Sequence, residues 1–99
     1  MSPEGEANRA SEELSVDNDH GLHLRPAADF VRLAARYRSQ VSVTNLTRGG
    51  DRRANARSLL EITALGIDRG HLIRLMARGA DADEAVTALS ELIRSNFGA

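Results

Sequence analysis

Residues 21–31 read GLHLRPAADFV, and within this stretch a loop becomes a helix. Apolar residues after His23 recur at the spacing of one helix face, namely Ala27, Phe30, Val31, Ala34 and Ala35. Pro26 suits the first turn of such a helix, because the N–H that proline lacks would have no intrahelical partner there. The stretch therefore predicts a helix that begins beside a histidine, an arginine and a proline.

Alternation and turn residues predict four strands around this helix. The first covers residues 14–16 and leads into a turn-rich loop. Residues 41–45 and 52–55 form a hairpin, whose turn is the sequence RGGD. Residues 71–78 mix Leu, Ile and Met with polar residues. We expect this last segment to be a central strand of the sheet.

Two further helices are marked by their first turns. Residues 58–61, SLLE, fit a capping box, in which the serine accepts a hydrogen bond from the N–H of the third helical residue and the glutamate reaches back to the serine N–H. We expect this short helix to bury Leu59, Ile62 and Leu65 and to end at Gly66. Acidic residues within 81–84 suit the N-terminus of the last helix, because the helix dipole favours negative charge there.

The elements follow the order βαββαβα, which predicts the fold class. Elements in that order pack as one four-stranded antiparallel sheet with helices on a single face, an α+β open-faced sandwich. The 99 residues suffice for one hydrophobic core. We expect residues 13–99 to form this domain. Residues 1–12, MSPEGEANRASE, are rich in polar residues, glycine and proline, and we expect them to form a disordered tail.

Composition argues against several kinds of function. The chain has no cysteine, so it holds neither a disulfide framework nor a thiolate metal site. Its net charge is −1, and no run of arginines is interleaved with aromatic residues, so nucleic acid is not an expected partner. No apolar stretch approaches the roughly 20 residues of a membrane span, and the N-terminus lacks the apolar segment of a signal peptide. We expect a cytoplasmic protein without membrane insertion.

His23 combines a nucleophilic side chain with a position that favours anions. The first N–H groups of a helix have no intrahelical partners, and the helix dipole adds positive potential. The N–H groups of Leu24 and Arg25 are thus placed to bind a phosphate on His23, and the Arg25 guanidinium adds positive charge. A neutral imidazole is also a covalent nucleophile. A histidine at a helix start is nevertheless more commonly a cap or a surface residue, and the residues alone leave both interpretations open.

The other two histidines carry weaker signals. His20 lies three residues before His23, but no third ligand follows at a suitable spacing, so no metal site is predicted. We expect His71, which follows a turn, to be an exposed residue. The sequence holds no nucleotide-binding loop, carboxylate pair or metal cluster that would run chemistry on a small molecule.

The stretch GLHLRPAADFV resembles the phosphorylation-site signature of the HPr family, in which histidine is followed two residues later by arginine and then by proline. Other family landmarks are matched in order and spacing by NARSLL at 55–60, LGI at 65–67 and GADA at 79–82. The resemblance covers the chain from Glu13 onward. Two positions depart from the family pattern. Leu24 stands where alanine, threonine or valine is usual, and His20 stands where asparagine is usual.

The resemblance implies a phosphocarrier rather than an autonomous enzyme. His23 would receive a phosphoryl group on Nδ1 from the phosphohistidine of enzyme I. It would then pass the group to a histidine of an enzyme IIA-type domain, with Arg25 steadying the phosphoryl group. No metal or nucleotide is implied, and we expect a shallow exposed site.

The resemblance also assigns a partner surface and a candidate regulatory site. Leu24, Leu59, Leu60 and His20 would lie on the surface that meets donor and acceptor, and we expect at least one of the leucine pair 59–60 to be exposed. Ser58 matches a serine that a dedicated kinase phosphorylates in some family members, although the capping box explains it without regulation. A monomer is expected, because a carrier must present one face to both partners in turn.

Alternatives remain open at this point. Several stretches resemble HPr-like domains of multidomain phosphotransferases, including the phosphoryl donor subunit of dihydroxyacetone kinase. A carrier for sugar uptake, a carrier for dihydroxyacetone phosphorylation and a domain of a longer polypeptide all fit the sequence. A different class is an interaction or regulatory module without a phosphorelay, but the presence of both His23 and Arg25 argues against it. An enzyme with its own substrate would need catalytic groups that the sequence lacks.

Overall fold

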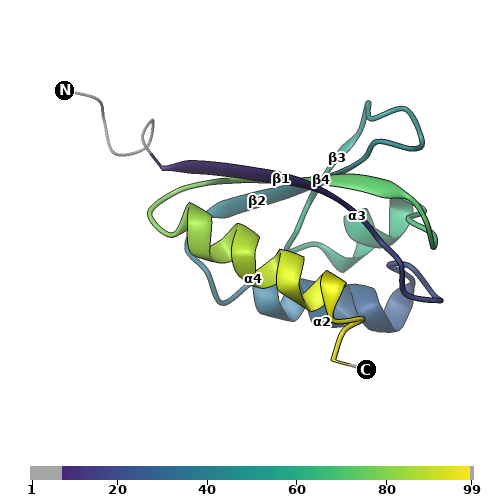
Figure 1. Cartoon of the computed structure of the whole chain (residues 1–99). Helices are drawn as coiled ribbons and strands as arrows, with labels where there is room; N and C mark the ends of the chain where they lie inside the picture. Colours follow the sequence, from purple (N-terminus) through teal and green to yellow (C-terminus); the bar gives the residue numbers. More distant parts are fainter. Residues whose placement is uncertain (1–7, 99) are drawn as a thin grey trace.

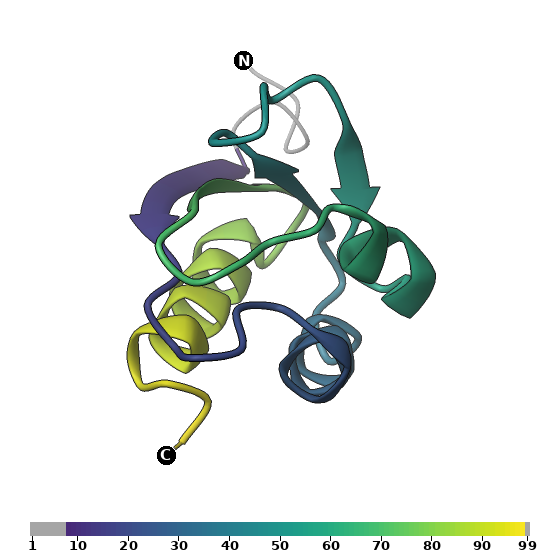
Figure 2. The same ribbon diagram turned by 90° about the vertical axis from the view of Figure 1, so that its right-hand side faces the viewer.

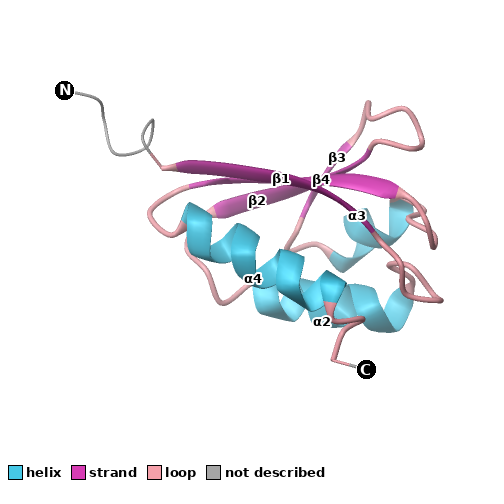
Figure 3. Cartoon of the chain, in the orientation of Figure 1, coloured by secondary structure: helices cyan, strands magenta, loops and turns pink. Residues whose placement is uncertain are grey.

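The computed structural model describes residues 8–98, and its elements follow the predicted order. The strands are β1 (Arg9–Ser15), β2 (Gln40–Asn45), β3 (Arg53–Asn55) and β4 (Leu72–Arg78). The helices are α2 (Leu24–Ala34), α3 (Leu59–Ala64) and α4 (Ala82–Arg94) (Figure 1). The helices all lie on one side of the sheet (Figure 3). The predicted α+β open-faced sandwich is confirmed.

The prediction that residues 71–78 form a central strand is also confirmed. The strand order is β1-β4-β2-β3, and all neighbouring strands are antiparallel. Leu14 is opposite Ile73, and Val43 is opposite Leu75. These four side chains are buried. Because alternate residues of a strand point to opposite faces, this register puts the apolar side chains together on the face that the helices cover.

The hydrophobic core lies between that face and the helices. Buried side chains come from every element of the two layers, and among the fully buried ones are Phe30, Val43, Ile62, Leu75 and Leu89. The helix face predicted after His23 contributes Ala27, Phe30 and Ala34, whereas Ala35 lies beyond the end of α2 and is exposed. Within residues 8–98, no helix is both long and apolar enough to cross a membrane.

The first strand is longer than predicted, and the predicted disordered tail over residues 1–12 is wrong for residues 9–12. β1 begins at Arg9, which is opposite Arg78, and the pairing with β4 continues to Ser15. The backbone hydrogen bonds between β1 and β4 do not require apolar side chains. The polar sequence RASE therefore forms a strand although it lacks the apolar alternation from which a strand is predicted. Residues 1–7 of the predicted tail lie outside the described residues.

The capping box at α3 is half confirmed. Ser58 Oγ accepts a hydrogen bond from Glu61 N–H at 3.2 Å, as predicted. The Glu61 carboxylate, however, accepts from Asn55 N–H at 2.9 Å, and Ser58 N–H donates to the Asn55 carbonyl. Glu61 therefore joins α3 to β3 instead of closing the cap. The predicted burial of Ile62 is confirmed, but that of Leu59 is wrong, because this side chain is 36% exposed.

A single carboxylate fastens the start of α4 to the turn before β2. Asp81 is the N-cap residue of α4, yet its side chain makes no capping bond to its own helix. It accepts instead from the N–H groups of Arg38 and Ser39, both at 2.9 Å, and from Ser39 Oγ at 2.6 Å. These bonds, led by the Ser39 hydroxyl, lower the pKa of Asp81 from 3.8 to about 2.

We predict that Asp81→Asn destabilises the fold at neutral pH and that the difference from the parent protein becomes smaller in acid. A carboxyl group with a depressed folded pKa stabilises the fold above its unfolded pKa and loses this contribution as the pH falls through the folded pKa. The relevant window runs from 3.8 down to about 2. Urea unfolding at pH 7 and at pH 3 measures the effect, with Asp83→Asn, an exposed residue of the first turn of α4, as the control. An equal loss of stability at both pH values would contradict the account.

Two loops meet at one end of the sheet and position the site. The β1–α2 loop and the α3–β4 loop lie side by side (Figure 2), and Leu22 N–H donates to the Ile67 carbonyl at 2.9 Å. Gly21 has a φ of 55°, and a Cβ there would lie 2.2 Å from the Ile67 carbonyl oxygen and 2.8 Å from Asp68 Cα. Only glycine permits this conformation and this approach of two backbones together.

Gly21→Ala is expected to lower the free energy of unfolding by more than the roughly 1–3 kcal/mol typical of a strained backbone conformation, because the new Cβ also collides with the neighbouring loop. Gly70→Ala is the matched control. Gly70 has a φ of 87°, but no atom lies within 4 Å of a Cβ built there. Denaturant unfolding of both variants separates conformational strain from collision, and equal losses would show that the loops do not constrain each other at Gly21.

Candidate functional site around His23

His23 occupies the N-cap position of α2 and presents its side chain to solvent. Its backbone is extended, with φ −74° and ψ −175°, and its side chain makes no capping bond to the helix. The His23 carbonyl accepts from Ala27 N–H at 2.9 Å, which starts the helix. The imidazole side chain is 61% exposed. A partner protein can therefore reach the ring directly.

The first turn of α2 offers free hydrogen-bond donors next to this ring. Within residues 8–98, the N–H groups of Leu24 and Arg25 donate to no other group, and Pro26 has no N–H. Unpaired N–H groups and the helix dipole together make the start of a helix a site for anions. No acidic residue stands in this first turn to compete with an incoming anion. The N–H groups of Leu24 and Arg25 are therefore available to an anion beside the ring.

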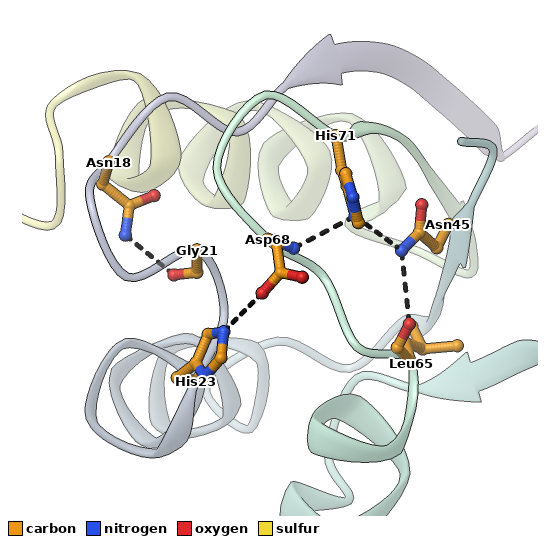
Figure 4. Close-up of polar contacts among 7 residues, drawn as sticks. All are labelled: Asn18, Gly21, His23, Asn45, Leu65, Asp68 and His71. Carbon is orange, nitrogen blue, oxygen red and sulfur yellow. Dashed lines mark hydrogen bonds and ion pairs between the residues drawn. The ribbon is translucent and has the colours of Figure 1, made fainter. Parts of the chain in front are cut away.

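Asp68, which sequence reasoning missed, contacts the imidazole directly. His23 Nε2 and Asp68 Oδ1 are 2.6 Å apart, although the two residues are 45 positions apart in the chain (Figure 4). The hydrogen bond from His23 is the main cause that lowers the pKa of Asp68, and the positive charge of His23, when protonated, acts in the same direction. Asp68 is therefore an anion at neutral pH. The only hint in the sequence was an acidic residue in the turn IDRGH.

A shallow hollow of about 430 Å³ opens beside the imidazole. It is lined by His20, His23, Arg25, Pro26, Asp29 and Phe97. The structure therefore brings together three of the predicted site residues, the two histidines and Arg25. Arg25 and His20 are exposed, and within residues 8–98 the Arg25 guanidinium belongs to no ion pair. Phe97, which comes from the end of the chain, was not predicted to lie here.

The predicted partner surface is apolar and exposed on two helices. Leu24 in the first turn of α2 is 68% exposed, and Leu60 in the first turn of α3 is 80% exposed. Leu59 is exposed to a smaller extent. The prediction that at least one of the leucine pair is exposed is confirmed.

The composition of the site limits the chemistry that it can support. Within residues 8–98, no group of three or more His, Cys, Asp or Glu side chains is arranged to hold a metal ion. The groups that are present are an exposed imidazole, a carboxylate on one of its nitrogens, free backbone N–H groups and a guanidinium. This set suits the transfer of an anionic group to and from a histidine in an open site.

Comparisons with known proteins agree with this geometry. The family model "PTS HPr component phosphorylation site" matches residues 10–95. The multiphosphoryl transfer protein of Escherichia coli O157:H7 is 42% identical over 88 residues, which cover 89% of this chain and 23% of that protein. The chain thus spans about a quarter of the length of this relative.

Shorter relatives are matched over nearly their whole length. The phosphocarrier protein HPr of Buchnera aphidicola is 38% identical over 78 residues, which cover 79% of this chain and 87% of that protein. The crystal structure of HPr-C-His from Thermoanaerobacter tengcongensis superposes with a TM-score of 0.84 at 38% identity, covering 91% of this chain and 97% of that one. The chain belongs to the HPr family of phosphocarrier proteins of the phosphotransferase system.

Proposed function

We propose that this protein carries a phosphoryl group on His23 Nδ1, taking it from the phosphohistidine of enzyme I and passing it to a histidine of an enzyme IIA-type domain. One observation carries the assignment to Nδ1. His23 Nε2 is occupied by Asp68 at 2.6 Å, so the other ring nitrogen is the one with a free lone pair. That nitrogen belongs to an exposed ring at the start of a helix, where an anion is favoured.

The transfer needs little from the protein beyond positioning and charge. The Nδ1 lone pair attacks the phosphorus, the new N–P bond forms, and the P–N bond of the donor breaks with its electron pair returning to the donor imidazole. The N–H groups of Leu24 and Arg25 stabilise the phosphoryl oxygens, and the Arg25 guanidinium adds a mobile positive charge. The same steps in reverse order deliver the group to the acceptor.

The surface around the site supports alternating contacts with two partners. The exposed leucines at 24 and 60 lie at the first turns of α2 and α3 and would be covered when a partner docks. His20 lies on the rim of the hollow. Because donor and acceptor must use this same face in turn, we propose that the carrier is a monomer. We also propose that it acts in the cytoplasm. A dimer that buried the face would block both transfers.

The identity of the acceptor distinguishes two versions of the proposal. The first is a relay to a IIA-type domain of a sugar transporter. The second, which rests on the resemblance to HPr-like domains of multidomain phosphotransferases, is a relay dedicated to dihydroxyacetone phosphorylation. Phosphorylated protein offered separately to a IIA-type domain and to a dihydroxyacetone-kinase phosphoryl donor protein tells the two apart by which one gains the phosphoryl group.

Incubation with phosphoenolpyruvate and purified enzyme I is expected to add the mass of one phosphoryl group, which acid removes, and His23→Ala is expected to abolish the gain. Intact-protein mass spectrometry measures both. Asp83→Ala is the control, because it changes an exposed residue of α4 that does not line the hollow and leaves the acceptor in place. A gain of mass in His23→Ala would place the acceptor on another residue, and no gain in the parent protein with several enzymes I would favour an interaction module without a relay.

Ser58 is proposed as a regulatory position, where a phosphate would add negative charge next to the exposed Leu59 and Leu60 of the partner surface. Its structural role makes a separate prediction. Ser58→Ala should lower the free energy of unfolding by about 0.5–2 kcal/mol, because the cap bond to Glu61 N–H is lost. Ser58→Asp should keep the cap and weaken partner docking, seen as a higher concentration of enzyme I for half-maximal transfer. Unchanged transfer in Ser58→Asp would remove the regulatory role.

A further inference from the structure

The loop that carries Asp68 is held by a second histidine. His71 Nδ1 lies 3.1 Å from Asp68 N–H and 3.1 Å from the Asn45 side-chain amide nitrogen (Figure 4). Both of these groups are donors, so His71 Nδ1 acts as their acceptor and carries no proton. The expectation of a plain exposed residue is wrong, because His71 is half-buried and has partners on two sides.

Asn45 joins this loop to the sheet and to α3. It is the last residue of β2 and is 4% exposed. Its side-chain amide also donates to the Leu65 carbonyl at 3.2 Å, and its side-chain oxygen accepts from Arg48 N–H at 3.3 Å. Buried polar groups with all partners satisfied fix a single local arrangement. The chain of contacts therefore runs from β2 through Asn45 and His71 to the backbone of Asp68.

The Asp68 carboxylate determines which nitrogen of His23 bears the proton. An ionised carboxylate only accepts hydrogen bonds, so at a separation of 2.6 Å the proton between the two groups sits on Nε2. In the neutral imidazole the Nδ1 lone pair is then free. When Nδ1 forms its bond to phosphorus, the ring gains positive charge, and the adjacent carboxylate stabilises that charge. The Nε2 proton stays in place through both transfers.

We propose that Asp68 is the positioning residue for phosphoryl transfer through His23, and that His71 and Asn45 hold Asp68 in place to do this. The inference rests on the proposed function of His23 and extends it. Arg69 next to Asp68 pairs with Asp19 at 3.2 Å, Arg48 acts on the Asp68 carboxylate from a distance, and Arg25 and Asp29 line the hollow on the other side of the His23 ring. Within the described residues, the His23 ring has Asp68 as its single ion-pair partner.

The first test measures the ring itself and needs no relay partner. Nitrogen-15 shifts and long-range proton couplings of the imidazole report which nitrogen carries the proton. In the parent protein we expect the proton on His23 Nε2. In Asp68→Ala we expect a larger share of the tautomer with the proton on Nδ1. Asp19→Ala is the matched control, because it removes an exposed carboxylate of the neighbouring loop that pairs with Arg69 and does not touch His23.

The second test measures transfer from phosphorylated enzyme I. Asp68→Ala and Asp68→Asn should lower the rate constant at saturating donor by about two- to fivefold, the size expected for an exposed charged pair, while the donor concentration for half-maximal rate stays unchanged. His71→Ala should give a smaller loss of the same kind, with folding checked by its thermal transition. Asp19→Ala should match the parent protein.

The outcomes separate this inference from the proposed function. If the parent protein accepts no phosphoryl group, the proposed function fails, but the ring measurement still decides whether Asp68 holds the proton on Nε2. If transfer occurs and Asp68→Ala changes neither the ring tautomer nor the rate constant, the positioning role is overturned. A rise in the half-maximal donor concentration with an unchanged rate constant would also overturn it, because this would make Asp68 a docking residue.

Discussion

The hydrogen bond from Leu22 N–H to the Ile67 carbonyl is the contact on which the site depends. It joins the loop before α2 to the loop before β4, and the glycine at position 21 allows the two backbones to touch. Without this contact, His23 would be an ordinary exposed residue at a helix start. With it, a carboxylate from a distant part of the chain reaches one nitrogen of the ring and leaves the other free.

The fold supplies the two halves of the site from different sources. The start of α2 contributes the imidazole and the free N–H groups, and these follow from local sequence. The turn between α3 and β4 contributes the carboxylate, and its position follows from the pairing of β4 with β1 and β2 and from the Asn45 and His71 contacts.

Local signals predicted the helices, the order of the elements and the central position of β4, because each depends on apolar periodicity or on a capping residue. They failed where backbone pairing or a distant partner decides the structure. Arg9 and its neighbours form a strand because β4 offers them ladder bonds. Glu61 turns to Asn55 N–H, which no pattern within the short helix could indicate. Asp68 contacts His23, although the two residues are 45 positions apart in the sequence. The periodicity of a single sequence indicates local structure and gives no information on such a contact.

The most direct test of the account is a nitrogen-15 and phosphorus-31 NMR spectrum of the phosphorylated protein, in which couplings between phosphorus and the ring nitrogens identify the bonded atom. The account predicts phosphorus on His23 Nδ1, with Nε2 protonated toward Asp68. Phosphorus on Nε2 would show that the Asp68 contact breaks during transfer, and phosphorus on any other residue would contradict the assignment of His23 as the acceptor.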